Sequence, residues 1–208
     1  MKKLWPLLFL SLLLAACAAS PYSYITNFNS HSGKNLICFG DSLTAGDGAQ
    51  PGTAYPDIIS GTVKYPVINA GVSGDTTVKA LARIETDVLD KEPRMVVVEL
   101  GANDFIQAAG SPAALDKVFD NLSQIVVRIQ DAGAAVAIAD VNIDPDMSSR
   151  YKKLARVMGA LYIPDIMNDV ANRPELMADR VRPNSFGYAK MSGNILNYLR
   201  PVLKAMDQ

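Results

Sequence analysis

The sequence is poor in histidine and cysteine, and neither sign of charge is in clear excess. Its 208 residues include one histidine and two cysteines, and the formal net charge is -1. With neither charge in excess, the composition implies neither nucleic acid nor an acidic surface as a partner. The single histidine, His31, is the only imidazole available for acid-base chemistry near neutral pH. The composition, 49% hydrophobic and 20% charged, is otherwise typical of a globular domain.

The N-terminus has the pattern of an export signal. Lys2 and Lys3 precede an apolar run over residues 4–14, and small residues follow before Cys17. The run is too short for a membrane span and ends in small residues, which favours a cleaved signal peptide over residues 1–16. The alternative is an uncleaved N-terminal anchor.

The segment Leu14-Ala15-Ala16-Cys17 resembles the lipobox of bacterial lipoproteins. The resemblance implies that Cys17 becomes the acylated N-terminus and holds the protein to a membrane through buried acyl chains. Ala18 replaces the aspartate that tends to retain lipoproteins in the inner membrane, so the implied location is the outer membrane, facing the periplasm. Cys38 then has no disulfide partner, and we expect it to be a small buried hydrophobe.

The segment after Cys17 is rich in serine and asparagine and shows no sustained period up to residue 34. We expect residues 17–34 to carry the lipid and form a flexible tether with a coil reach of roughly 20–25 Å. Residues 35–208 are enough for one domain with a sizeable core.

Short apolar runs alternate with longer amphipathic segments along that domain. Because each crossover between parallel strands must bury a helix against the sheet, this alternation predicts a three-layer α/β/α sandwich with a parallel five-stranded sheet. Functional residues of such folds lie at the carboxyl ends of the strands. The expected strands are residues 35–40, 65–71, 94–101, 134–141 and 160–165, and the expected helices are 76–92, 111–133, 148–159 and 183–206.

Three loops at that edge carry candidate chemistry. Ser42, in the Gly-Asp-Ser-Leu turn of residues 40–43, can expose its hydroxyl beside backbone N–H groups, although Asp41 or Ser42 could instead only cap the next helix. Gly74 offers a backbone N–H and Asn103 an amide donor to one developing oxyanion. Turn formation is the alternative role for both. Convergence of all three on one edge favours a catalytic site.

These motifs resemble the SGNH, or GDSL, hydrolase family, whose fold is flavodoxin-like. The match covers FGDSLTAG, NAGVSGDTT, VELGAND and RPNSFGYAKM in order, from Leu36 to about Leu199, and is most similar to the thioesterase/lysophospholipase and arylesterase branch. The resemblance implies that Ser42 is the nucleophile and Asp179 the triad acid. It implies an oxyanion hole of the Ser42 and Gly74 N–H groups and the Asn103 amide. We expect no cofactor, no metal and a monomer that acts on acyl ester or lipid substrates.

The last block departs from the family pattern, which reads Asp, two variable residues, His, Pro. Asp179 and Pro183 fix the register, and Arg182 falls on the histidine position. Arginine has no lone pair and stays protonated, so it cannot act as the base. His31 precedes the first strand whereas Ser42 follows it, about 20 Å away. We expect Arg182 either to pair with Asp179 or to point into solvent.

The missing base leaves three hypotheses for function. The chain is an envelope ester hydrolase working through water, a substrate group or an unusual base, with weak or lost activity. Alternatively it is a non-catalytic lipoprotein that binds an acyl chain, an acetylated glycan or a partner protein, with Arg182 holding an anionic group. In the third, one substitution has disabled an otherwise active scaffold.

Overall fold

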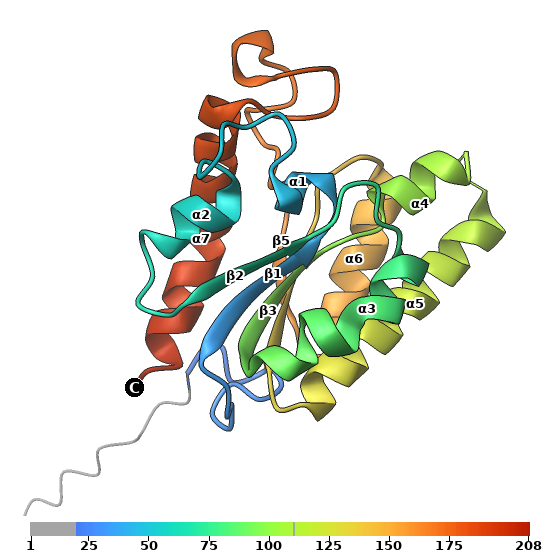
Figure 1. Cartoon of the computed structure of the whole chain (residues 1–208). Helices are drawn as coiled ribbons and strands as arrows, with labels where there is room; N and C mark the ends of the chain where they lie inside the picture. The colour runs from blue at the N-terminus through green and yellow to red at the C-terminus, as the bar shows by residue number, and fades with distance from the viewer. Residues whose placement is uncertain (1–19, 110) are drawn as a thin grey trace, which may run out of the picture.

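A computed structural model describes residues 20–109 and 111–208, so the expected signal peptide and Cys17 lie outside the described residues. The strands form one parallel sheet in the order β2-β1-β3-β4-β5 (Figure 1). This confirms the predicted five-stranded parallel sheet. The strands are β1 Asn35–Gly40, β2 Val67–Gly71, β3 Pro93–Glu99, β4 Ala135–Ala139 and β5 Leu161–Ile163.

Helices cover both faces of the sheet and confirm the three-layer sandwich. On one face the core includes α2 and α7, and on the other it includes α3, α5 and α6 (Figure 1). The helices are α1 Ser42–Ala45, α2 Tyr55–Ser60, α3 Thr77–Asp87, α4 Ala102–Gln107, α5 Pro112–Asp131, α6 Pro145–Val157 and α7 Ser185–Ala205; short 3-10 turns are Leu89–Lys91 and Pro174–Leu176.

The central strands are mostly apolar, as expected for strands covered on both faces. Successive side chains of β1 point to opposite faces, so Ile37 and Phe39 enter one core and Leu36 and Cys38 the other. Cys38 is fully buried, and burial raises the pKa of its thiol to about 12. The expectation that Cys38 is a small buried hydrophobe is confirmed.

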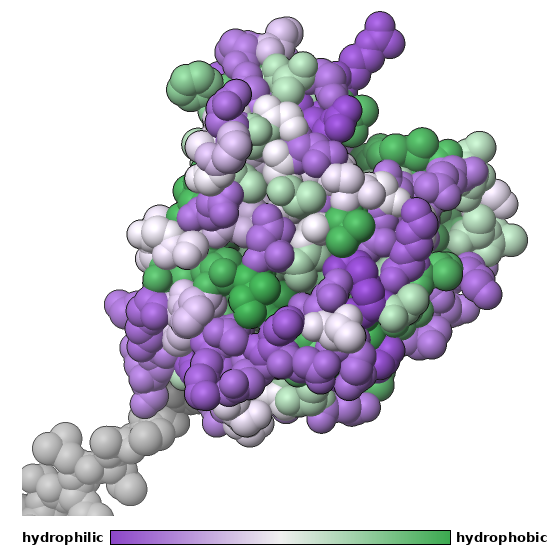
Figure 2. Space-filling view, viewed as in Figure 1, coloured by the Kyte–Doolittle hydropathy of each residue, from purple (hydrophilic) through white to green (hydrophobic). Residues whose placement is uncertain are grey.

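On the face shown in Figure 2 the surface is mainly hydrophilic, with apolar groups dispersed across it.

The N-terminal segment is packed onto the domain, so the predicted flexible tether is wrong for residues 20–34. Ile25 and Phe28 are 2% and 3% exposed and belong to the core. The Asn27 amide donates to the carbonyls of Gln130 and Ala134 at 2.7 and 3.1 Å. Two apolar residues three apart are too few to give a period, which is why the sequence did not reveal this contact. The segment lies at the end of the sheet opposite α1 (Figure 1).

His31 lies in this same segment, where its Nδ1 is 3.1 Å from the carbonyl oxygen of Phe28. Because Ser42 follows β1 and His31 precedes it, the strand separates them by roughly 20 Å. The structure therefore keeps the single imidazole away from Ser42, as predicted.

In the described part of the chain, no helix has the length and apolar character that a membrane crossing requires.

Candidate functional site

The turn after β1 presents Ser42 at the start of α1. Asp41 caps this helix, because its Oδ1 accepts a hydrogen bond from the Leu43 N–H at 3.0 Å. Ser42 is half-buried, and within residues 20–109 and 111–208 its hydroxyl has no hydrogen-bond partner. The cap is thus supplied by Asp41, and the serine hydroxyl stays available.

Two backbone N–H groups next to this turn are also unengaged. Neither the Ser42 N–H nor the Gly74 N–H donates to an acceptor in the described part of the chain. Gly74 has φ +73°, a left-handed conformation that favours glycine, and a Cβ placed there would meet nothing within 4 Å. The Gly74 loop is therefore open to a ligand.

Asn103 joins this turn to the Gly74 loop. Its amide nitrogen donates to Asp41 Oδ2 at 3.0 Å and to the Asp75 carbonyl at 2.9 Å. The predicted convergence of the three motifs is confirmed. Both amide hydrogens are engaged, so a ligand oxygen would have to compete with one of these acceptors for the Asn103 amide.

Arg83 clamps the same two loops from α3. It donates through Nε to Asp75 Oδ2 at 2.9 Å, and its Nη2 lies 2.8 Å from the same oxygen and donates to the Gly40 carbonyl at 3.1 Å. The guanidinium also lies 4.5 Å from the centre of the Phe39 ring. Sequence reasoning missed this residue, because a charged residue on an amphipathic helix normally indicates a solvated face.

A buried acid pair, Asp41 and Glu99, lies beneath the serine turn. The two residues are 3% and 1% exposed, and the Thr44 hydroxyl donates to Glu99 Oε2 at 2.9 Å. Burial raises the pKa of Asp41 to about 6. Burial, and then the negative charge of Asp41, hold the pKa of Glu99 well above its usual range. Both carboxyls of the pair are therefore harder to ionise than free carboxyls.

We expect this pair to make the folded state less stable as pH rises. The folded pKa of Asp41 lies above its ordinary value of 3.8, so its contribution is fully present below pH 3.8 and is lost as pH rises through about 6. The raised pKa of Glu99 acts in the same direction. Thermal unfolding should show a melting temperature several degrees lower at pH 8 than at pH 5.

The variant Glu99→Gln should flatten this dependence, because the amide cannot ionise and its oxygen can still accept from Thr44. The exposed carboxyl Glu85, paired with Arg128 at the surface, supplies the matched control Glu85→Gln, which should leave the slope unchanged. If the melting temperature of Glu99→Gln falls with pH as steeply as that of the parent, the pH dependence does not come from the Asp41–Glu99 pair.

The last block holds Arg182 between two carboxylates. Arg182 Nε donates to Asp179 Oδ2 at 2.7 Å, and its Nη1 donates to Asp47 Oδ2 at 3.3 Å. The predicted pair with Asp179 is confirmed, with a single hydrogen bond from the side chain. Asp47, which also accepts from the Ser73 hydroxyl at 2.8 Å, was not predicted.

These contacts fix the protonation states of the block. Asp179 Oδ1 accepts from the backbone N–H groups of Val181 and Arg182 at 2.8 Å each, and these bonds lower the pKa of Asp179. The hydrogen bond to Asp179 raises the pKa of Arg182. Neither side chain of this pair therefore has a pKa near neutrality.

The last block packs on the chain that follows Ser42. The Tyr188 hydroxyl donates to the Asp47 carbonyl at 2.9 Å and to the Ser42 carbonyl at 3.4 Å. At Gly48 a Cβ would lie 2.6 Å from the Pro183 carbonyl, so the two segments approach too closely for a side chain. Arg182 is thereby held at the same edge as Ser42.

A hollow of about 660 Å³ adjoins the Gly74 loop. It lies among α4, the start of α5 and the beginning of α3. Its lining includes Thr76, Val78, Gln107, Ala108 and Ala114.

Comparison with known proteins agrees with this geometry. Residues 38–190 match the GDSL-like Lipase/Acylhydrolase family, and the chain belongs to this family of esterase-type hydrolases. It is 30% identical to an arylesterase of Vibrio mimicus over 183 residues, 82% of this chain and 86% of the relative.

Two further similarities concern the same branch. Identity to the thioesterase 1/protease 1/lysophospholipase L1 of Escherichia coli K12 is 27% over 190 residues, 86% of this chain and 89% of the relative. The crystal structure of TesA superposes with a TM-score of 0.73 at 25% identity, covering 81% of this chain and 99% of that one.

Proposed function

We propose that this chain is an envelope-anchored SGNH ester hydrolase in which proton transfer is impaired. Ser42 is the nucleophile, and the N–H groups of Ser42 and Gly74 with the Asn103 amide stabilise the oxyanion. One observation carries the impairment: the position expected for the base holds Arg182, which is ion-paired to Asp179 and Asp47 and has no lone pair.

Acyl transfer at this site begins with attack of the Ser42 oxygen on the substrate carbonyl. Donors aimed at the developing oxyanion stabilise it, and the two unengaged N–H groups are suited to this. The serine proton, however, has no imidazole to receive it and must pass to water. In a template serine hydrolase about 10³ to 10⁴ of acceleration over water survives without the triad, through the oxyanion hole and binding. We expect residual turnover on that scale.

The substrate class is an acyl ester, thioester or lysophospholipid, with the hollow beside Gly74 receiving the acyl group.

The carboxylates around Arg182 disfavour binding of an anionic group of the ligand at this residue. Its Nε and Nη1 already face Asp179 and Asp47, so an incoming anion would meet two carboxylates around one cation.

A non-catalytic binding protein is the second candidate, and the absent base favours it. In that case the hollow binds an acyl chain, an acetylated glycan or a partner protein without cleavage. The second candidate would use the same hydrogen-bond donors, Ser42, Gly74 and Asn103, as the hydrolase. It differs from the hydrolase only in that the bound ligand is not cleaved.

The envelope location is proposed from the N-terminus. Residues 1–16 would be removed as a lipoprotein signal peptide, and acylated Cys17 would hold the domain of residues 35–208, with the N-terminal segment packed on it, as a monomer on the periplasmic face of the outer membrane.

Hydrolysis of a short aryl ester and an acyl thioester tests the proposal. The parent should turn over slowly, and Ser42→Ala should remove the part of the rate that passes through acyl transfer to Ser42, leaving only what the oxyanion donors and binding supply. The exposed-serine control Ser32→Ala should leave the parent rate unchanged. A parent rate equal to that of the Vibrio arylesterase, measured alongside, would contradict an impaired site. Binding of an ester analogue without any Ser42-dependent turnover would favour the second candidate.

A further inference from the structure

The end of α6 and the packed N-terminal segment form one exposed basic and apolar surface. We call it the basal surface and define it as Tyr24, Lys152, Lys153, Arg156 and Val157. We propose that the basal surface lies against the membrane that holds the lipid anchor, so that the catalytic edge points away from that membrane. The inference rests on the proposed acylation of Cys17.

Covalent geometry limits how far the anchor can be from this surface. Three peptide units separate Cys17 from Ser20, and each spans at most about 3.6 Å, so the two residues are within about 11 Å. The Ser20 carbonyl accepts the Ser23 N–H at 3.0 Å, and the Thr26 N–H donates to the Gly159 carbonyl at 2.8 Å. The anchor therefore leaves the domain close to the turn that ends α6.

The exposed residues of the basal surface suit an anionic bilayer. Val157 is 68% exposed and Tyr24 is 54% exposed. Lys152, Lys153 and Arg156 are exposed, and none of them forms an ion pair within the described part of the chain. Cations near an anionic membrane surface are attracted to it. Tyrosine is enriched at membrane interfaces because it joins an apolar ring to a polar hydroxyl.

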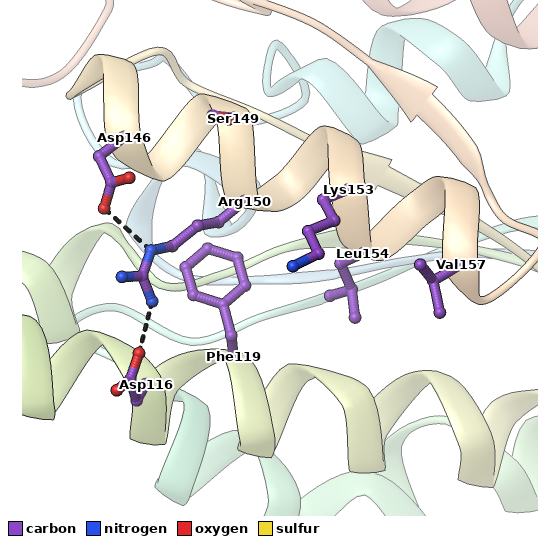
Figure 3. A pocket seen from close by; sticks show the side chains of 8 residues that line it. All are labelled: Asp116, Phe119, Asp146, Ser149, Arg150, Lys153, Leu154 and Val157. Carbon is purple, nitrogen blue, oxygen red and sulfur yellow. Dashed lines mark hydrogen bonds and ion pairs between the residues drawn. The ribbon is translucent and has the colours of Figure 1, made fainter.

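Charge changes sign along α6. At its start, Arg150 is neutralised by Asp116 at 2.7 Å and Asp146 at 2.9 Å. Figure 3 shows these pairs at one end of the groove between α5 and α6, and Lys153 with Val157 toward the other. The groove has a volume of about 570 Å³, and its second end is apolar and basic. The end of α6 that meets the N-terminal segment is thus the end that anionic lipids attract.

This orientation places Ser42 at the end of the sheet that is farther from the membrane. The six residues of β1 separate the N-terminal segment from the serine turn by roughly 20 Å. A lipid embedded in the anchoring leaflet cannot reach Ser42 without lifting the domain. Within the proposed substrate class, this favours acyl esters, thioesters or lysophospholipids that reach Ser42 from the aqueous side.

Two matched probes test the orientation in the lipidated full-length protein on vesicles containing anionic lipid and a headgroup-bound fluorescence quencher. Val157→Cys places a label on the basal surface, and Val181→Cys, 60% exposed, places one at the catalytic edge. Buried Cys38 is shielded from the reagent. Quenching at position 157 should exceed quenching at position 181 severalfold. Equal quenching, or stronger quenching at position 181, would overturn the orientation.

Charge reversal tests the cause. Lys152→Glu with Arg156→Glu should abolish the difference between the probes, whereas the matched reversal Lys117→Glu with Arg180→Glu should preserve it. Persistence of the difference in the first pair would overturn the role of these cations. Flotation separates this inference from its premise: protein that does not float with the vesicles overturns the anchor at Cys17, and protein that floats with reversed quenching overturns the orientation alone.

Discussion

Replacing Arg182 with histidine is expected to raise ester turnover by about a thousandfold or more, since a positioned general base contributes about 10² to 10⁴ and loss of the histidine in a template enzyme costs about 10⁶. An imidazole near neutral pH can accept the serine proton and return it to the leaving group. The rate should rise in kcat, and steady-state hydrolysis of an aryl ester measures it.

The surroundings of residue 182 already suit a histidine at this position, because Asp179 is held in place. The Asp179 carboxylate is oriented by its own backbone, through the N–H groups of Val181 and residue 182, and does not depend on the arginine side chain. Its second oxygen, which now accepts from Arg182 Nε, would be open to an imidazole N–H. Histidine would therefore enter an environment that fixes its tautomer.

Two control variants test whether a gain in turnover comes from the added imidazole base or from removal of the arginine side chain. Arg182→Gln removes the cation without adding a base and should give no comparable gain. Ser42→Ala in the Arg182→His background should abolish the gain. An equal rise in Arg182→Gln would mean that arginine blocks the pocket, and no rise in a folded Arg182→His protein would mean that other parts of the site have changed.

The fold and the meeting of the motifs could be predicted because both depend on local patterns. Strand and helix periods determine a parallel sheet, and a parallel sheet brings its carboxyl ends to one edge. Asn103, Asp41 and the Asp75 carbonyl meet there for that reason. The prediction that Arg182 stands at the family's histidine position also depends on a local pattern, because Asp179 and Pro183 fix the register around it.

The remaining features depend on pairing between distant residues. Arg83 is 43 positions from Gly40, and Thr44 is 55 positions from Glu99. No spacing rule connects such residues, and a buried carboxyl within an apolar strand is not distinguished by periodicity. The same holds for Ile25 and Phe28, whose burial depends on the tertiary surface they meet.

Arg83→Met is expected to destabilise the fold by about 3–5 kcal/mol, because removing one partner leaves a buried charge uncompensated. The Asp75 side chain is 1% exposed and that of Arg83 is 16% exposed, so solvent cannot replace the lost interaction. Arg128→Met is the matched control: its partner Glu85 is 61% exposed, and loss of such a surface pair costs about 1 kcal/mol or less. Denaturant unfolding measures both, and a loss below 1 kcal/mol for Arg83→Met would contradict the clamp.

Adding Asp75→Asn to Arg83→Met should recover part of this stability, because the second change removes the stranded charge. It should not restore catalysis. The Asp75 carbonyl accepts a hydrogen bond from the Asn103 amide, and Gly74 precedes Asp75. The loop that carries this proposed oxyanion donor would therefore still lack its tie to Gly40. In the Arg182→His background, the Arg83→Met, Asp75→Asn variant should be more stable than Arg83→Met alone. Its ester turnover should still be slower than that of Arg182→His with Arg83 and Asp75 intact. Full recovery of turnover would show that Arg83 acts only on stability.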